Sequence, residues 1–137
     1  MAQIIDTSVL ITLERQGRPL DLLMTAARTP DEPLALAAIT VSELLAGVYR
    51  ADSNERRRQR EDFAEAIFAT MAVLPFDTRV ARTHARVWAE LVDSGRTVGA
   101  NDLLIAATAL THGYDVLTEN PRDFERVPGL VVLQPNR

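Results

Sequence analysis

Short apolar runs alternate with segments of helical periodicity along most of the chain, and this alternation limits the fold more than any other feature of the sequence. Strands that alternate with helices predict a parallel sheet with helices on both faces. The runs that we interpret as buried strands are residues 4–5, 34–39, 72–76, 114–118 and 130–133. We therefore expect the α/β class, with a five-stranded parallel sheet flanked by helices in three layers and residues 1–137 forming a single domain.

The helical segments lie between these runs. They are residues 8–13 as the start of a first helix, 40–51, 54–72, one beginning near Asp77 or Thr78, Ala100–His112, and a short turn at 121–126. Gly113 is typical of a left-handed helix stop. In the helix after Asp77, the spacing predicts a core-facing stripe made of Val80, Val87 and Leu91 beside Ala81, Ala85, Trp88 and Val92.

The charge and the basic residues narrow the possible functions. The formal net charge of -4 argues against a protein that holds nucleic acid on a broadly basic surface, although brief contact with RNA remains allowed. All fifteen basic residues are arginine. The absence of lysine excludes a Walker-type phosphate loop, Schiff-base catalysis and a receiver-like phospho-switch. The absence of cysteine excludes disulfides and thiolate metal sites.

The chain shows neither a signal-peptide pattern at its start nor an apolar stretch of the roughly 18 residues that a membrane span needs. We therefore expect a cytoplasmic protein.

Three acidic residues occupy positions where predicted elements begin or end. Asp6 follows the first strand, Glu43 falls in the first turn of the helix after the second strand, and Asp102 falls in the first turn of the Ala-rich helix. The carboxyl edge of a parallel sheet is where ligands bind in such folds. Each acid also has a structural explanation: Asp6 as a helix cap, Thr40 with Glu43 as a capping box, and Asp102 as a favourable charge at a helix start.

Convergence of the three acids would make the site electrostatically costly without a counter-charge. Two carboxylates about 4 Å apart repel by roughly 4 kcal/mol at an effective dielectric near 20. A shared proton, an arginine or a hard divalent cation would relieve this repulsion, and carboxylate oxygens suit Mg²⁺ or Mn²⁺. The two histidines, His84 and His112, are isolated on different predicted helices, and we assign neither to the site.

Three blocks, in this order, resemble a PIN domain of the VapC toxin family: IIDTSVLI, TVSELLAGV, and GANDLLIAATALTHGYDVLTENPRDFERVPGLVVL. The resemblance implies an Mg²⁺-dependent endoribonuclease, the growth-inhibiting toxin of a type II toxin-antitoxin pair, that leaves 5′-phosphate and 3′-hydroxyl ends. It also implies a VapB-like antitoxin as partner, with homodimers and toxin-antitoxin hetero-oligomers.

The resemblance also assigns the site residues. The family's acids map onto Asp6, Glu43 and Asp102, its hydroxyl beside the first acid maps onto Ser8, and Asn101 precedes the third acid as it does in relatives. Ser8 would orient Asp6 or a metal-bound water.

The fourth acidic position departs from the family pattern. Many PIN domains have an aspartate where this chain has Asn120, and Asp123 is the nearest substitute. One ion on Asp6 and Asp102, with Glu43 close by, is therefore expected. Whether a second ion binds stays open, and a non-catalytic PIN module that binds RNA or a protein partner is the alternative function.

An arginine-rich run begins the helix at 54–72. Its members are Arg56, Arg57, Arg58 and Arg60. Mixed charges at a helix start favour a solvated face with internal ion pairs, while contact with RNA or antitoxin is the alternative. The same alternatives apply to Arg79, Arg82 and Arg86.

Overall fold

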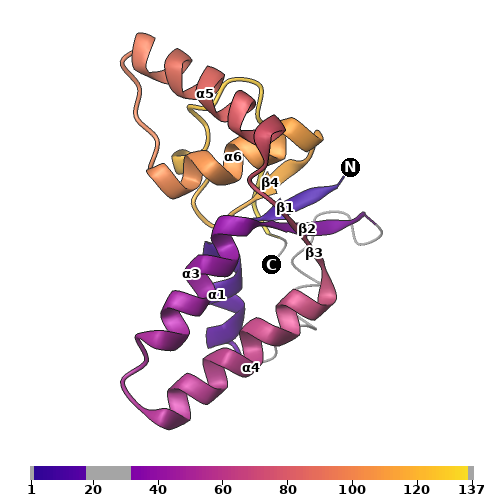
Figure 1. Ribbon diagram of the computed structural model, residues 1–137, viewed down its shortest axis with the longest axis vertical. Helices are drawn as coiled ribbons and strands as arrows, with labels where there is room; N and C mark the ends of the chain where they lie inside the picture. The colour runs from indigo at the N-terminus through magenta and orange to yellow at the C-terminus, as the bar shows by residue number, and fades with distance from the viewer. Residues whose placement is uncertain (1, 18–31, 136–137) are drawn as a thin grey trace.

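The computed structural model describes residues 2–17 and 32–135, and in this part of the chain a parallel sheet separates two groups of helices (Figure 1). The strands are β1 (Gln3–Ile5), β2 (Leu34–Ala37), β3 (Ala72–Leu74), β4 (Asp115–Leu117) and β5 (Val132–Leu133). The described strands form a five-stranded sheet in the order β3-β2-β1-β4-β5, and every neighbouring pair is parallel. The predicted α/β class and sheet are confirmed.

The helices are distributed over the two faces of the sheet. They are α1 (Thr7–Arg15), α3 (Ala38–Tyr49), α4 (Asn54–Thr70), α5 (Thr78–Asp93) and α6 (Ala100–His112), with a short 3₁₀ helix, η1, at Pro121–Asp123. Figure 1 shows α5 and α6 on one side of the strands and α1, α3 and α4 on the other. None of the helices in the described ranges is both long and apolar enough to span a bilayer.

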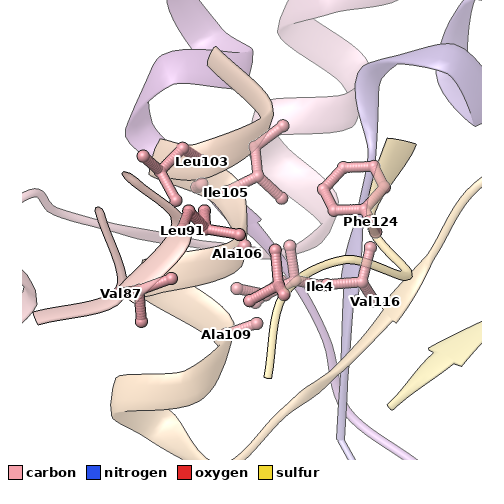
Figure 2. Close-up of a cluster of buried hydrophobic side chains, with 12 residues drawn as sticks. Ile4, Val87, Leu91, Leu103, Ile105, Ala106, Ala109, Val116 and Phe124 are labelled. Atoms are coloured by element: carbon pink, nitrogen blue, oxygen red, sulfur yellow. The ribbon is translucent and has the colours of Figure 1, made fainter. Parts of the chain in front are cut away.

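Alternate residues of the central strands supply the two halves of the core, because successive side chains of a strand point to opposite faces. Ile4 and Val116 pack with α5 and α6, where Val87, Leu91 and Ile105 converge on them (Figure 2). The next residue along each of these strands faces the other side, and the residues of that second cluster include Ile5, Leu117, Leu10, Leu44, Phe63 and Ile67. The resulting burial on both sides fixes the central strands in register.

Two element boundaries differ from the prediction. The run at 34–39 was expected to be strand throughout, but α3 begins at Ala38, so Ala38 and Ile39 belong to the helix. An apolar run of small residues is compatible with either state, and here the pairing of β2 with β1 ends before Ala37. The strand expected at 72–76 ends at Leu74, directly before Pro75, and β3 lies at the edge of the sheet.

The stripe predicted on α5 is only partly correct. Val80, Val87 and Leu91 are buried, but Trp88 is 58% exposed and Val92 is 64% exposed, and Ala85 is exposed as well. α6 covers one side of α5, so only the residues that face α6 and the sheet are enclosed. The prediction failed because the apolar surface of α5 extends beyond the area that α6 covers.

Candidate active site

Asp6 lies directly after β1 and is held by hydroxyl groups rather than by the helix that follows. It occupies the N-cap position of α1, yet its side chain accepts no hydrogen bond from the backbone of that helix. Instead, Asp6 Oδ2 accepts hydrogen bonds from Ser8 Oγ at 2.6 Å and from Thr118 Oγ1 at 2.8 Å. The helix-cap interpretation of the side chain is therefore wrong, and the carboxylate is fixed at the carboxyl ends of β1 and β4.

Thr118 and Ser8 connect Asp6 to the loop that follows β4. Thr118 is fully buried, and its Oγ1 also accepts the backbone N–H of Asn120 at 3.0 Å. Ser8 Oγ accepts the backbone N–H of Glu119 at 3.1 Å. One carboxylate oxygen, two hydroxyls and two backbone amides thus form one network, which positions the strand ends relative to each other. The expected role of Ser8 in orienting Asp6 agrees with this geometry.

Glu43 is presented from the second turn of α3, not from the first, because the helix begins at Ala38. The predicted capping box is wrong for the same reason: the N-cap is Ala37, and no side chain caps this helix. Thr40 is fully buried and instead contacts Thr7, with 3.1 Å between the two hydroxyl oxygens. The structural explanation for Glu43 therefore no longer applies.

Two neighbours hold the Glu43 carboxylate. The buried hydroxyl of Thr7 donates to Oε1 at 2.7 Å, and Asn101 Nδ2 approaches Oε2 at 3.5 Å, the outer limit of a hydrogen bond. Thr7 belongs to α1 and Asn101 to α6, so Glu43 lies where three helices approach the sheet edge. Thr7 was not predicted as a site residue, although its place between Asp6 and Ser8 in a run of hydroxyl residues was the available signal.

Asp102 lies in the first turn of α6, as predicted, and its charge is opposed by its surroundings. Burial is the largest cause that raises the pKa of Asp102 to about 6, and the negative charges of Asp6, Asp123 and Glu43 contribute the rest of this rise. Gly99 leaves room for this side chain, since a Cβ at Gly99 would be 3.3 Å from Asp102 Oδ2. Asp6, Glu43, Asp102 and Asp123 are called the acidic cluster below.

The acidic cluster suits a cation by its chemistry. Hard carboxylate oxygens are the ligands that Mg²⁺ and Mn²⁺ prefer, and a cation would relieve the repulsion at Asp102. Within the described ranges, however, no three histidine, aspartate or glutamate side chains are placed so that they could hold one ion together. Metal binding by Asp6, Glu43 and Asp102 therefore stays a prediction, and an ion would have to draw these carboxylates closer together.

The fourth position is shared between Asn120 and Asp123. Asn120 is the exposed residue before η1, and its backbone carbonyl accepts the N–H of Asp123 at 3.0 Å. Asp123 is near enough to raise the pKa of Asp102, whereas Asn120 brings no charge. Asp123 is thus the fourth acid of the cluster in space, and its role in binding a second ion stays a prediction.

The arginines of α4 have structural partners in part. Arg56 forms an exposed ion pair with Asp52 at 3.4 Å, and Arg60 Nη1 donates to the carbonyl of Gly47 at 2.7 Å. Burial raises the pKa of Glu14, and the charges of Arg60 and Arg15 oppose this rise. Arg60 therefore connects α4 with α3 and α1. Arg57 and Arg58 are exposed, and their contact with RNA or antitoxin stays a prediction.

The histidines lie on α5 and α6, as expected from the sequence. The ring of His84 meets that of Phe76 edge to face and that of Trp88 at a tilt, and His112 meets Tyr114 edge to face. Neither contributes to the raised pKa of Asp102.

Comparison with known proteins gives a consistent result. The family model described as PIN domain matches residues 4–130. The chain is 39% identical to Ribonuclease VapC1 of Rickettsia felis over 97% of this chain and 96% of the relative. It is 34% identical to the tRNA(fMet)-specific endonuclease VapC of Salmonella typhimurium over 71% of each.

A solved structure shows the same fold at similar sequence identity. It is described as a member of the VapBC family of toxin-antitoxin systems, VapBC-5, from Mycobacterium tuberculosis. The matched chain is 34% identical, with a TM-score of 0.76 and coverage of 99% of this chain and 98% of that chain.

Proposed function

This chain belongs to the VapC ribonuclease family of PIN domain proteins, and on that premise we propose that it is an Mg²⁺-dependent endoribonuclease and the toxin of a type II toxin-antitoxin pair. The observation that carries the proposal is the acidic cluster. The negative charges of its members lie close enough to raise the pKa of Asp102. In addition, neither the helix cap considered for Asp6 nor the capping box considered for Glu43 is present to explain these acids.

The chain's own residues prepare this cluster for a cation. Asp6 and Asp102 are the proposed ligands, with Glu43 close by. Ser8 and Thr118 bind one oxygen of Asp6, which fixes the plane of the carboxylate and leaves Oδ1 outside these two bonds. Thr7 restrains Glu43 in the same way. Mg²⁺ or Mn²⁺, when bound, supplies a water of lowered pKa and stabilises negative charge on the phosphate.

RNA is the proposed substrate, with products that carry 5′-phosphate and 3′-hydroxyl ends. Without a cation, the negative charges of the cluster would repel a phosphodiester, so the same residues that make the site would keep RNA out. The dependence on metal follows from this repulsion. The relative from Salmonella typhimurium is named for cleavage of tRNA(fMet), so initiator tRNA is a rational first substrate to test.

A VapB-like antitoxin is the proposed partner. The matched solved structure is described as a toxin-antitoxin system, and an acidic cluster attracts a cationic side chain. We expect the antitoxin to insert an arginine or lysine near Asp6, Glu43 and Asp102 and thereby to block cleavage. Full nuclease activity in a saturated complex would contradict this part of the proposal.

The test compares the wild type with Asp102→Asn, a replacement of nearly equal size without the charge. Expression of the wild type should arrest growth, and the purified protein should cleave RNA with Mg²⁺ but not with chelator. Asp102→Asn should lose about 100-fold or more of the cleavage rate, as expected for removal of a group that stabilises the transition state.

Asp115→Asn is the matched control, because Asp115 begins β4 and therefore lies at the amino edge of the sheet. This variant should keep wild-type activity. Equal cleavage by the wild type and Asp102→Asn in chelator would overturn the metal-dependent mechanism.

A non-catalytic PIN module is the second candidate function. It is favoured by Asn120 at the position of the fourth acid and by the absence, in the described ranges, of three acids placed around one ion. The same purified protein distinguishes the two: RNA binding without cleavage in either Mg²⁺ or Mn²⁺ would support the module.

A further inference from the structure

Three exposed arginines lie on the segments that carry Asp102 and Asp123 of the acidic cluster. Arg96 lies in the loop before α6, whereas Arg122 and Arg126 lie in and just after η1. The arginines of α4 are elsewhere, since Figure 1 shows the first turns of α4 at the end of the molecule away from the strands. Of these two groups, only the arginines around η1 and the loop before α6 border the cluster.

Arg122 and Arg126 share one side of the segment that η1 begins. The N–H of Phe124 donates to the carbonyl of Pro121, and the N–H of Val127 donates to that of Phe124, so the turns continue beyond η1. Residues four apart in such turns lie on the same side. Phe124 is fully buried and Val127 nearly so, which fixes the opposite side of the segment against the core. The two arginines are therefore directed to solvent from a firmly anchored segment.

Arg126 is held in a second way. Its Nη1 donates to the backbone carbonyl of Thr97 at 3.0 Å. Thr97 lies in the loop that leads into α6, whose first turn carries Asp102. A guanidinium has several N–H donors, so this bond leaves the others for a second acceptor. The contact thus places a partly unsatisfied guanidinium beside the loop that leads to the cluster.

The two arginines are not spent on acids of the chain. In the ranges that the structure describes, neither forms an ion pair. They do not neutralise the cluster either, since every charge that shifts the pKa of Asp102 is negative. Arginines do act on an acid elsewhere, because Arg60 and Arg15 oppose the rise in the pKa of Glu14. The guanidinium groups of Arg122 and Arg126 are therefore available to an anion from another molecule.

An RNA strand is the anion that this arrangement fits. The cluster repels phosphate until a cation is bound, and a chain with a net charge of -4 has no broadly basic surface to compensate. Two guanidinium groups beside the cluster would offset this repulsion for the phosphates next to the one that is cut. Guanidinium suits this role because it can bind a phosphate in a bidentate manner.

We propose that Arg122 and Arg126, called the arginine pair, bind the backbone phosphates of RNA next to the scissile phosphate. The inference rests on the proposed nuclease function, but it concerns binding, which is measured without cleavage. Arg96 is left out because it lines a cavity of about 350 Å³ with Trp88, on the side of the loop that faces α5. The arginine pair contributes affinity without sequence preference, since phosphate contacts carry no direct sequence information.

The salt dependence of RNA binding tests the arginine pair. Fluorescence anisotropy of a labelled oligouridylate gives the association constant, in chelator and in the Asp102→Asn background so that the RNA stays intact. The logarithm of this constant falls linearly with the logarithm of the salt concentration, by about 0.7 for each phosphate contact to a single strand. Arg122→Gln and Arg126→Gln should each reduce the slope by about 0.7, and the double variant by about 1.4.

The same slopes fix the expected loss of affinity. Each single variant should bind about fivefold more weakly at roughly 0.1 M salt, with almost no difference near 1 M. An oligoadenylate of equal length should give the same reductions, because the contacts are to the backbone.

Arg50→Gln is the matched control, because it removes the same charge from the exposed C-cap of α3. It should leave the slope unchanged, since exposed charges more than about 10 Å apart are largely screened at this salt concentration. Arg126→Lys keeps the charge and should keep the slope. Thermal melts should show every variant folded, and if Arg126→Gln is destabilised by loss of its bond to Thr97, Arg122→Gln decides the outcome.

Three results would overturn the proposal. They are the absence of RNA binding at low salt, an equal loss of slope in Arg50→Gln and Arg122→Gln, and unchanged RNA binding in the double variant. If that last result came with weaker binding of the antitoxin, the arginine pair would belong to the antitoxin interface. Failure of the nuclease proposal would appear separately, as RNA left intact by the wild type in Mg²⁺.

Discussion

The acidic cluster and the exposed apolar face of α5, called its outer face and made of Ala85, Trp88, Ala89 and Val92, depart from the usual distribution of side chains in opposite ways. In the cluster, burial and then the like charges of neighbouring acids raise the pKa of Asp102 to about 6. On α5, large apolar side chains are left exposed, with Val92 at 64%. Departures of this kind from ordinary side-chain placement are commonly kept for function.

The two regions differ in how many interactions with the rest of the fold their side chains make. Asp6 and Glu43 are restrained by the buried hydroxyls of Thr118, directly after β4, and of Thr7 in α1. A change there should therefore lower the stability of the fold. The residues of the outer face of α5 are exposed, so few groups of the surrounding structure depend on them. Changes there should leave the free energy of unfolding almost unaffected.

The largest expected effect on stability comes from removing a hydroxyl at the acidic cluster. Thr118→Val keeps the size of the side chain but leaves Asp6 Oδ2 without one donor and the Asn120 N–H without its acceptor. Unfolding by urea should show a loss of about 1–3 kcal/mol, the usual range for unsatisfied buried polar groups. Thr118→Ser is the control and should recover most of this loss; a neutral Thr118→Val would show that water satisfies these groups.

Asp102→Asn should have the opposite sign. Because the pKa of Asp102 is raised in the folded state, wild type and variant should differ least below pH 4. The wild type then loses stability relative to the variant as the pH rises from about 4 to about 6. At neutral pH in chelator the variant should be more stable by on the order of 1 kcal/mol, a value discounted for solvent screening.

Excess Mg²⁺ should narrow this gap, since the wild type gains binding free energy that the variant largely loses. Thermal melts at pH 4 and pH 7, with chelator and with Mg²⁺, provide the measurement. A variant that melts below the wild type in chelator would make Asp102 a residue that stabilises the helix start, and the site assignment would fail.

The smallest effect is expected on α5. Val92→Thr exchanges the same two residue types as Thr118→Val, in the reverse direction and at an exposed position. The free energy of unfolding by urea should change by less than about 0.5 kcal/mol. A larger loss would mean that Val92 is enclosed within the monomer, and the contrast between the two regions would disappear.

The comparison also shows why some sequence predictions failed. Thr40 and Glu43 have the spacing of a capping box, but the start of α3 at Ala38 moves both into the helix. Trp88 and Val92 have the spacing of a core-facing stripe, but α6, the main neighbour of α5, does not cover them. In both cases the residue spacing was identified correctly. The outcome depended on neighbours from distant parts of the chain, which a local sequence pattern does not contain.

The sequence by itself determined the alternation of strands and helices, the strand-end position of Asp6 and the left-handed end of α6 at Gly113. These features follow from periodicity and backbone preference, which act between residues close in the chain. Only the tertiary structure decided that Thr118 binds Asp6, 112 residues away, that Thr7 restrains Glu43, and that Asp123 joins the cluster. Hydrogen bonds and charge repulsion of this kind depend on distances in space, and the crossover connections of a parallel sheet bring together residues that no local pattern relates.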